Sequence, residues 1–162
     1  MYKLYYSPGV CSLAVHAALN EINAEFELIN VADVKTFKDI NPRGAVPVLD
    51  MDGFLIREGA AILTYLLDNH DNDILPKSGL QRAAALEWLA FANSTLHPAY
   101  SRIFFMRKTL GINHTQDNAL YKPAIANIQH YWDEIEQRLQ DQEYLAGNTL
   151  TIADILVTVI AN

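Results

Sequence analysis

The hydrophobic periodicity of the sequence changes near residue 73, and this change constrains the fold more than any other feature. Before it, alternating or continuous apolar residues predict short strands at 2–6, 26–31, 46–51 and 54–57. Helical spacing in this part of the chain occurs at 12–20 and 59–69. The resulting order, β-α-β followed by β-β-α, favours a small α/β sandwich.

Beyond residue 79 the sequence shows helical spacing only. Helices are predicted over 80–108 and 116–140, and from Thr151 onward, where Thr151 and Asp154 have the spacing of a capping box. The expected organisation is an α/β domain at 1–73, a linker with Pro and Gly at 74–79, and an all-helical domain at 80–162.

Charge and composition disfavour several classes of protein. The 162 residues include 12 Lys and Arg against 19 Asp and Glu, without a basic cluster, so binding to nucleic acid or anionic lipid is disfavoured. No run of about 18 apolar residues occurs and the N-terminus lacks the apolar core of a signal peptide, so neither a membrane span nor export is predicted. Cys11 is the single cysteine and cannot form an internal disulfide, which favours the cytoplasm. No metal site is predicted.

Four short motifs occur in order along nearly the whole chain. They are YYSPGVCS at 5–12, NPRGAVP at 41–47, REGAAI at 57–62 and LTIAD at 150–154. In order and spacing they resemble the glutathione transferases, most closely the bacterial beta class, which has a cysteine in its active site. The resemblance implies the glutathione transferase fold, a thioredoxin-like N-terminal domain followed by an all-α C-terminal domain, in agreement with the periodicity. It also implies glutathione as co-substrate, a small apolar electrophile as its acceptor, and a cytoplasmic homodimer.

Cys11 is predicted to lie where the helix at 12–20 begins. There the helix dipole and free backbone N–H groups favour a thiolate, and such sites lower a cysteine pKa from about 8.5 to roughly 3.5–7.5. The simpler interpretation is a small buried hydrophobe, but the resemblance implies a catalytic thiol that hydrogen-bonds the sulfur of glutathione or forms a mixed disulfide with it. The hydroxyls of Tyr6 and Ser12 are backup donors, or else serve strand packing and helix capping.

Two motifs are expected to bind the backbone of glutathione. A residue before proline is extended, and the resemblance implies a cis Val46–Pro47 bond, with the Val46 backbone pairing to the cysteinyl unit. A helix is predicted to begin at Glu58-Gly59, so first-turn N–H groups can bind the γ-glutamyl carboxylate while the Glu58 carboxylate binds its ammonium. The simpler interpretation is that Glu58 only offsets the helix dipole.

The glycyl carboxylate of glutathione requires a cationic partner. The resemblance implies a lysine after the second strand, for which Lys35 is the nearest candidate and Lys38 an alternative. Otherwise both are solvated surface residues.

The helical domain is expected to supply a histidine. Residues 86–89 followed by Leu96-His97 resemble the family segment whose histidine reaches over the cysteine. His97 is therefore a catalytic candidate, because imidazole titrates nearest neutral pH. Ser94 and Thr95 are expected to line the same site.

Two positions depart from the family pattern. Pro98 stands where a basic residue is expected and Ala90 where an asparagine is expected, so two polar contacts are missing. Pro98 also lacks an N–H and clashes with the carbonyl four residues earlier, which predicts a kink. The aromatic residues Tyr100, Phe104 and Phe105 form a wall for the electrophile or belong to the core.

The sequence thus predicts a glutathione transferase that stabilises the glutathione thiolate near Cys11 and conjugates or reduces small electrophiles beside it. One alternative is a glutaredoxin-like reductase with Cys11 as nucleophile, and another is a non-catalytic binding module on the same scaffold. Glu58, Val46 and Cys11 argue against the module, whereas Pro98 and Ala90 leave room for it.

The last predicted helix is apolar on almost every side. Its apolar residues are Ile152, Ala153, Ile155, Leu156, Val157, Val159 and Ile160. Such a helix has to be buried all round, yet the sequence ends at Asn162 without a stop signal such as Gly or Pro. We therefore expect the helical domain to be truncated at its C-terminal end.

Overall fold

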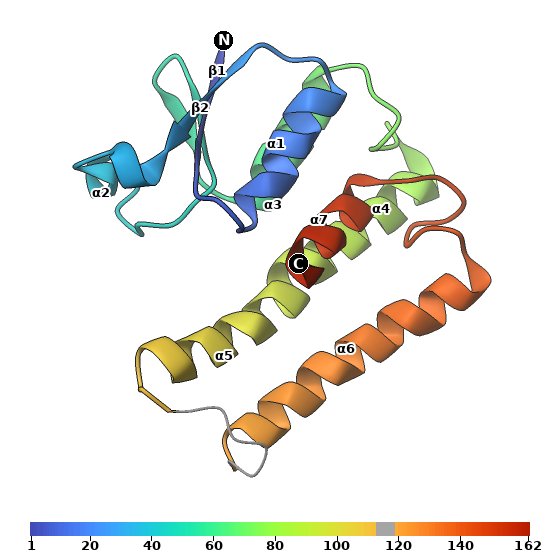
Figure 1. The fold of residues 1–162 in the computed structure, drawn as a ribbon. Helices are drawn as coiled ribbons and strands as arrows, with labels where there is room; N and C mark the ends of the chain where they lie inside the picture. The colour runs from blue at the N-terminus through green and yellow to red at the C-terminus, as the bar shows by residue number, and fades with distance from the viewer. Residues whose placement is uncertain (113–118) are drawn as a thin grey trace.

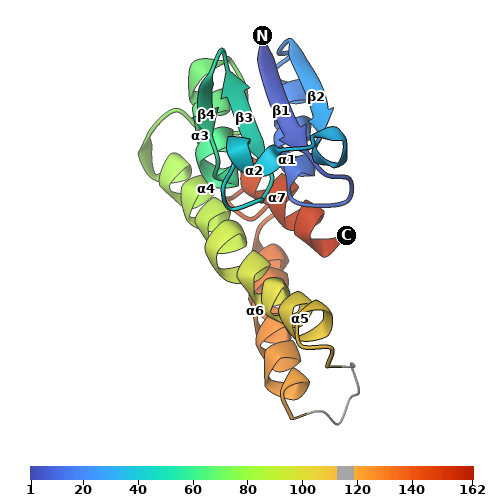
Figure 2. The ribbon, with the colours of Figure 1, turned by 90° about the vertical axis from the view of Figure 1, so that its left-hand side faces the viewer.

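The computed structural model describes residues 1–112 and 119–162 and confirms the predicted fold class, an α/β part followed by a helical part (Figure 1). The α/β part contains a four-stranded sheet in the order β2-β1-β3-β4. The long helices of the helical part extend away from the α/β part, as the side view in Figure 2 shows. No helix among the described residues is long and apolar enough to cross a membrane.

The central strand β1 (Tyr2–Tyr6) runs parallel to β2 (Phe26–Asn30) and antiparallel to β3 (Val48–Met51), which pairs antiparallel with β4 (Phe54–Ile56). The predicted β3–β4 hairpin is confirmed. Its turn residues Asp52 and Gly53 both have positive φ, 52° and 95°, as a two-residue turn between twisted strands requires.

Three strands are shorter than predicted: β4 ends at Ile56 instead of residue 57, and β2 and β3 are shortened for local reasons. β2 stops at Asn30 because the Asn30 side chain accepts the Ala32 N–H at 3.0 Å and opens a 3-10 helix, η1 (Val31–Asp33). β3 starts at Val48 because the preceding Pro47 has no N–H to donate to a neighbouring strand.

Two helices cover one face of the sheet, and a short helix contacts the other face. On one face α1 (Ser12–Glu21) packs against α3 (Gly59–Asn69), and their apolar residues meet Leu4 of β1 in the core. Tyr5 points to the opposite face, where its ring lies 5.9 Å from that of Phe37. Phe37 opens a short helix, α2 (Phe37–Ile40), which the sequence analysis did not predict.

The long helix predicted over 80–108 is interrupted by a π-helical turn. It consists of α4 (Gly79–Phe91), the π-turn η2 (Ala92–Leu96) and α5 (His97–Lys108). Because Pro98 has no N–H to donate to the preceding turn, the backbone register changes directly before it. A π-turn thus stands directly before Pro98, where a kink was predicted.

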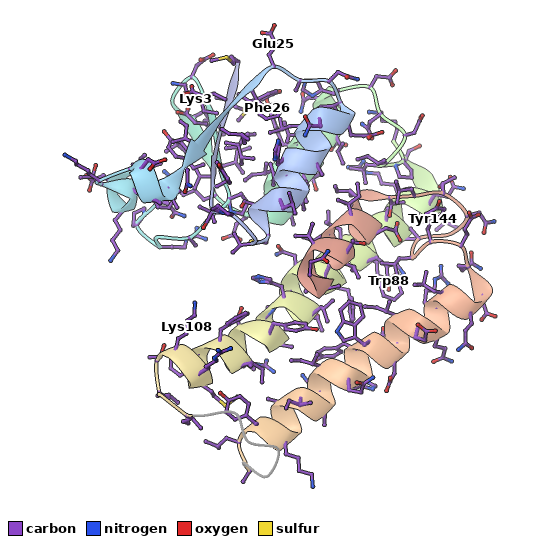
Figure 3. All side chains as sticks on the ribbon, in the orientation of Figure 1. Lys3, Glu25, Phe26, Trp88, Lys108 and Tyr144 are labelled. Carbon is purple, nitrogen blue, oxygen red and sulfur yellow. The ribbon has the colours of Figure 1, made fainter. Side chains whose placement is uncertain are left out.

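The helix α6 (Tyr121–Asp141) runs alongside α4 and α5. Its predicted start at Gln116 lies outside the described residues. Aromatic rings lie between these helices, among them that of Trp88 (Figure 3). Phe91 contacts both Trp88 and Tyr131 edge to face, and the Trp132 indole N–H donates to the Tyr100 hydroxyl at 2.7 Å. Tyr100 is thus partly a packing residue.

The helix α7 (Ile152–Ala161) joins the two parts of the molecule, since it packs on α1 as well as α4. Its residues Ile152, Ala153, Leu156 and Val157 are buried in the core that both parts share. Ile155, Val159 and Ile160 are half-buried and Thr158 is exposed, so burial is complete on one face only. The predicted capping box between Thr151 and Asp154 is confirmed.

Candidate active site

Cys11 lies at the junction of β1 and α1, as the residue directly before α1. The turn that leads to it uses Gly9 with φ 68°, and the Leu13 N–H donates to the Val10 carbonyl at 2.9 Å. The thiol is half-buried, and Sγ donates to the backbone carbonyl of Val46 at 3.5 Å. Two segments that are far apart in the sequence therefore meet at this sulfur.

Burial raises the pKa of the Cys11 thiol above its ordinary value. The N–H groups of Cys11 and Ser12 act in the opposite direction, as the helix-terminus argument requires, but their effect is smaller. The expected lowering of this pKa is therefore wrong. Desolvation of the sulfur by burial outweighs the helix terminus.

The two backup hydroxyls have structural roles. The Ser12 side chain is 1% exposed, its hydroxyl donates to the Ser7 carbonyl at 3.1 Å, and it accepts the Ser7 N–H at 3.4 Å. It fixes the turn before Cys11. Tyr6 packs against the core, as the strand-packing alternative predicts. Neither residue lines the cavity at Cys11.

The segment 41–47 is held in shape by Asn41, whose side chain is buried. Its amide donates to the Ala45 carbonyl at 2.7 Å and accepts the Arg43 N–H at 3.3 Å. The Val46–Pro47 peptide bond is cis, as the resemblance implied. This loop brings the Val46 backbone to the Cys11 sulfur.

Glu58 precedes the first residue of α3, Gly59, in an extended conformation. Its carboxylate forms an ion pair with Arg43, and the two side chains are 58% and 61% exposed. Arg43 was not predicted as a site residue. A nearby second arginine, Arg57, is half-buried and its Nε–H donates to the Ile40 carbonyl at 3.1 Å.

These groups surround one cavity of about 210 Å³, which we call the Cys11 cavity. From the α/β part it is lined by Cys11, Val15, Arg43, Ala45, Val46, Pro47, Arg57, Glu58, Gly59 and Leu63. From the helical part it is lined by Asn93, His97, Leu156 and Ile160. The predicted residues Cys11, Val46, Pro47, Glu58, Gly59 and His97 thus come together.

A second cavity of about 280 Å³ adjoins the first and shares Cys11, His97 and Ile160 with it. We call it the Phe104 cavity, because Phe104 and Tyr100 of α5 form part of its wall. Phe105, the third aromatic residue considered, does not line it and is 54% exposed.

His97 is half-buried at the start of α5, between the two cavities. Burial lowers the pKa of its imidazole, so the ring is neutral at neutral pH. A neutral imidazole can accept a proton from a thiol as well as donate a hydrogen bond.

Several predicted site residues lie outside both cavities. Ser94 is exposed and Thr95 half-buried, and neither lines the Cys11 cavity, because the π-turn directs Asn93 and His97 toward it instead. Lys35 is exposed and also outside. Lys38 is also exposed and outside both cavities, but it lies against the 41–47 loop, since a Cβ on Gly44 would lie 3.7 Å from its Cε.

Asn93 is the helical residue that the sequence analysis missed. A usable signal was its spacing of four residues from His97, which places two side chains on the same face of a helix.

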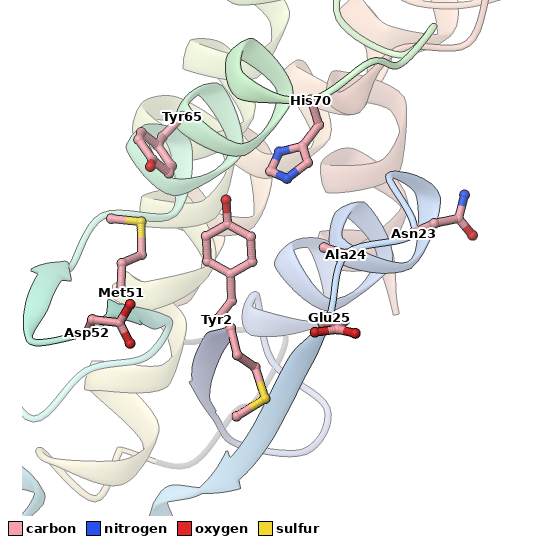
Figure 4. A pocket seen from close by; sticks show the side chains of 9 residues that line it. Tyr2, Asn23, Ala24, Glu25, Met51, Asp52, Tyr65 and His70 are labelled. Carbon is pink, nitrogen blue, oxygen red and sulfur yellow. The ribbon is translucent and has the colours of Figure 1, made fainter.

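A larger cleft of about 490 Å³ lies at the other end of β1 (Figure 4). It is lined by Tyr2, Tyr65 and His70 among others, and the rings of Tyr2 and His70 are 5.7 Å apart. Burial, and then Tyr65, raise the pKa of Tyr2. The cleft contains no predicted site residue and no cysteine, so its greater volume does not make it the active site.

Comparison with known proteins identifies the family. A family model described as the N-terminal domain of glutathione S-transferase matches residues 2–74, and one for the C-terminal domain matches residues 93–162. The glutathione S-transferase GstA of Escherichia coli O157:H7 is 33% identical over 94% of this chain and 77% of its own length. Glutathione S-transferase GST-4.5 of Xanthomonas campestris pv. campestris is 36% identical over the same shares, 94% and 77%.

Solved structures give the same result for the fold. The ternary complex of BphK, a bacterial GST, has a TM-score of 0.84 at 32% identity, covering 98% of this chain and 80% of that chain. A sphingomonad glutathione S-transferase complexed with glutathione has a TM-score of 0.83 at 30% identity, with coverage of 98% and 80%.

Proposed function

The chain belongs to the glutathione S-transferase family and is a glutathione transferase, and we propose that it holds glutathione in the Cys11 cavity and its electrophile in the Phe104 cavity. The observation that carries this proposal is the convergence of Cys11, the Val46 backbone and the first turn of α3 on one cavity. The cysteinyl unit of glutathione would pair with Val46, which places its sulfur beside Cys11.

The γ-glutamyl group of glutathione is a zwitterion and fits the opposite end of the cavity. Its carboxylate would accept from the first-turn N–H groups of α3, and its ammonium would pair with the Glu58 carboxylate. Glu58 already pairs with Arg43, so the ammonium replaces or joins that guanidinium. We assign the glycyl carboxylate to Lys38 rather than Lys35, because Lys38 lies against the 41–47 loop.

Conjugation then proceeds by displacement. The thiolate of glutathione attacks the electrophilic carbon, a carbon–sulfur bond forms, and the leaving group departs with its electron pair. The thiol proton passes to the neutral imidazole of His97 or to solvent. The raised pKa of Cys11 keeps its thiol protonated, which suits a hydrogen-bond donor to the glutathione sulfur.

The same protonation argues against the glutaredoxin-like alternative. A Cys11 nucleophile that forms a mixed disulfide has to react as the thiolate, and burial disfavours that form. We therefore propose a cysteine-type enzyme of the beta class in which Cys11 is a donor.

The remaining features of the proposal concern assembly and context. We propose the domain boundaries 1–73 and 80–162 with the linker between them, and a cytoplasmic homodimer that acts in detoxification. An open cavity between α3 and α4, whose lining includes Ala60, Ala61, Leu86 and Leu89, supports self-association through this side of the molecule.

The test is calorimetric titration with glutathione, followed by conjugation of an aryl halide. Heat of binding and turnover are expected; absence of heat and of thermal stabilisation at millimolar glutathione would rule out both enzyme functions. Binding without turnover would favour the non-catalytic module. In a Cys11→Ala variant, conjugation is expected to continue at a lower rate, whereas loss of disulfide reduction alone would identify Cys11 as a nucleophile.

A further inference from the structure

We infer that the side-chain amide of Asn93 binds the γ-glutamyl carboxylate of glutathione from the helical side of the cavity. This inference rests on the proposed function and adds a binding residue to it. The expected site residues of the helical part did not include Asn93.

The position of Asn93 relative to α3 is the first observation. Asn93 lines the Cys11 cavity together with Gly59, the first residue of α3. A Cβ built on Gly59 would lie 3.7 Å from Asn93 Oδ1. The amide therefore lies beside the helix terminus whose N–H groups are expected to receive the carboxylate.

The chemistry of the amide is the second observation. Asn93 is half-buried, and no hydrogen bond joins its side chain to another described residue. Asn93 and His97 are the polar side chains that the described helical part contributes to this cavity. His97 lines this cavity and the Phe104 cavity. The Asn93 atom that faces Gly59 is Oδ1, so binding requires a half-turn of the amide, which exchanges its oxygen and nitrogen and presents the N–H to an acceptor at the Gly59 end.

The backbone explains why this residue takes the position. The family resemblance placed an asparagine at position 90, where this chain has alanine. Ala90 is exposed and lines the open cavity between α3 and α4, not the Cys11 cavity. The π-turn starts at Ala92 and directs position 93 inward, so the chain carries an amide one turn later and on a different face.

Charge supports a neutral donor at this point. Glu58 and its partner Arg43 are largely exposed, so solvent weakens their hold on a zwitterion. A neutral amide N–H can donate to a carboxylate inside the cavity without adding a second charge that has to be desolvated.

The experiment compares two ligands that differ by the γ-glutamyl group alone, S-methylglutathione and S-methylcysteinylglycine. Their affinities are measured by calorimetry in the wild type and in Asn93→Ala, Asn93→Asp and Asn127→Ala. Asn127 is a half-buried asparagine on α6 outside the cavity and serves as the matched control.

Asn93→Ala is expected to weaken S-methylglutathione about tenfold, the size of one hydrogen bond to a charged group, and to leave S-methylcysteinylglycine unchanged. Asn93→Asp is expected to weaken S-methylglutathione further, because two carboxylates would then face each other. Asn127→Ala is expected to bind both ligands as the wild type does.

Three outcomes would overturn the inference. They are an Asn93→Ala affinity within about twofold of wild type, an equal loss for both ligands, and wild-type affinity in Asn93→Asp. In each case the wild type still binds S-methylglutathione, so the proposed function stands. Failure of the wild type itself to bind would instead contradict the proposed function.

Discussion

The two walls of the Cys11 cavity are built in different ways. The α/β wall consists of turns at the ends of strands and helices, and it presents backbone groups, at Val46 and at the first turn of α3, with Cys11 beside them. The helical wall consists of side chains on helix faces, chiefly Asn93 and His97, with Leu156 and Ile160 behind them.

This difference has a functional consequence. Backbone groups at a turn are fixed by the local chain, so the α/β wall is suited to the constant part of the ligand, glutathione. Side chains on a helix face can be exchanged without changing the fold, so the helical wall is suited to contacts that differ between related chains, among them the inferred contact of Asn93 with glutathione and the contacts with the electrophile. The following changes test how the two walls are held in place and what they bind, beginning with the largest expected effect.

Asp154→Ala is expected to lower the free energy of unfolding by roughly 2–4 kcal/mol, because it removes a helix cap and leaves buried donors unpaired. The Asp154 carboxylate accepts from the Thr151 N–H, the Thr151 hydroxyl and the Leu145 N–H, each at 2.8 Å. Urea denaturation is the measurement, with the exposed Asp141→Ala as control. Equal midpoints for the two variants would show that α7 does not depend on this cap.

Glu58→Gln is expected to weaken glutathione about tenfold, or roughly 1.4 kcal/mol. The loss of a buried charged pair is larger, roughly 2–5 kcal/mol, but the Glu58 side chain is 58% exposed and solvent screens it. Calorimetry with the isosteric control Glu27→Gln, an exposed residue of β2, makes the comparison. An affinity equal to that of the control would remove Glu58 from the site.

Ser12→Ala is expected to lower the free energy of unfolding by about 1 kcal/mol, since the buried hydroxyl makes two hydrogen bonds to Ser7. Conjugating activity per folded molecule should change little. Ser78→Ala, at an exposed position whose side chain makes no capping bond, is the control. A loss of activity without a loss of stability would restore Ser12 as a donor to the glutathione sulfur.

In the folded chain, the Cys11 thiol is expected to react with iodoacetamide at a higher pH than the same thiol does in the chain unfolded in urea, because burial raises its pKa. The folded state thus favours the protonated thiol. This contribution to stability is complete below the pKa of the unfolded state and disappears as pH rises through that of the folded state. Stability of the wild type should therefore fall, relative to Cys11→Ala, on the alkaline side. If the midpoint pH of the reaction is lower in the folded chain than in the unfolded chain, the helix dipole outweighs burial at this thiol.

Gly59→Ala is expected to have the smallest effect, where the two walls approach each other. An added Cβ would meet Asn93 Oδ1 and Pro47 Cγ at 3.7 Å, which is ordinary van der Waals contact. Stability should stay within about 0.5 kcal/mol of wild type or rise slightly, since alanine restricts the unfolded chain. Thermal unfolding with glutathione titration checks this. A large loss of stability or of glutathione affinity would mean that the two walls lie closer together than the structure places them.

How far the sequence predicted the site depends on the wall. The segments at Cys11, Val46–Pro47 and Glu58-Gly59 were predicted together, because the family resemblance assigned them to one site and local residues placed Cys11 and Glu58-Gly59 at helix starts. Strand β1 and helix α3 were predicted with their observed bounds. The helical wall was predicted at His97 only, and Ser94 and Thr95 were expected in place of Asn93.

The sequence by itself determined the order of strands and helices, the hairpin at Asp52-Gly53, the capping box at Thr151 and the placement of Cys11 before α1. All of these depend on residues that are neighbours in the chain, and local dihedral preferences and side-chain spacing specify them. A family resemblance in four short motifs then identified the chemistry that such a fold supports.

Only the tertiary structure decided which face of the helix at 92–97 meets the cavity, and whether the Cys11 pKa rises or falls. The first depends on a π-turn that shifts every side chain after it, and the second on desolvation by segments such as the Val46 loop. Burial at a point is the sum of contributions from distant segments, whereas a helix dipole belongs to a single helix. The local sequence therefore specified the helix dipole, which lowers the Cys11 pKa, whereas the burial that raises this pKa depends on the tertiary fold.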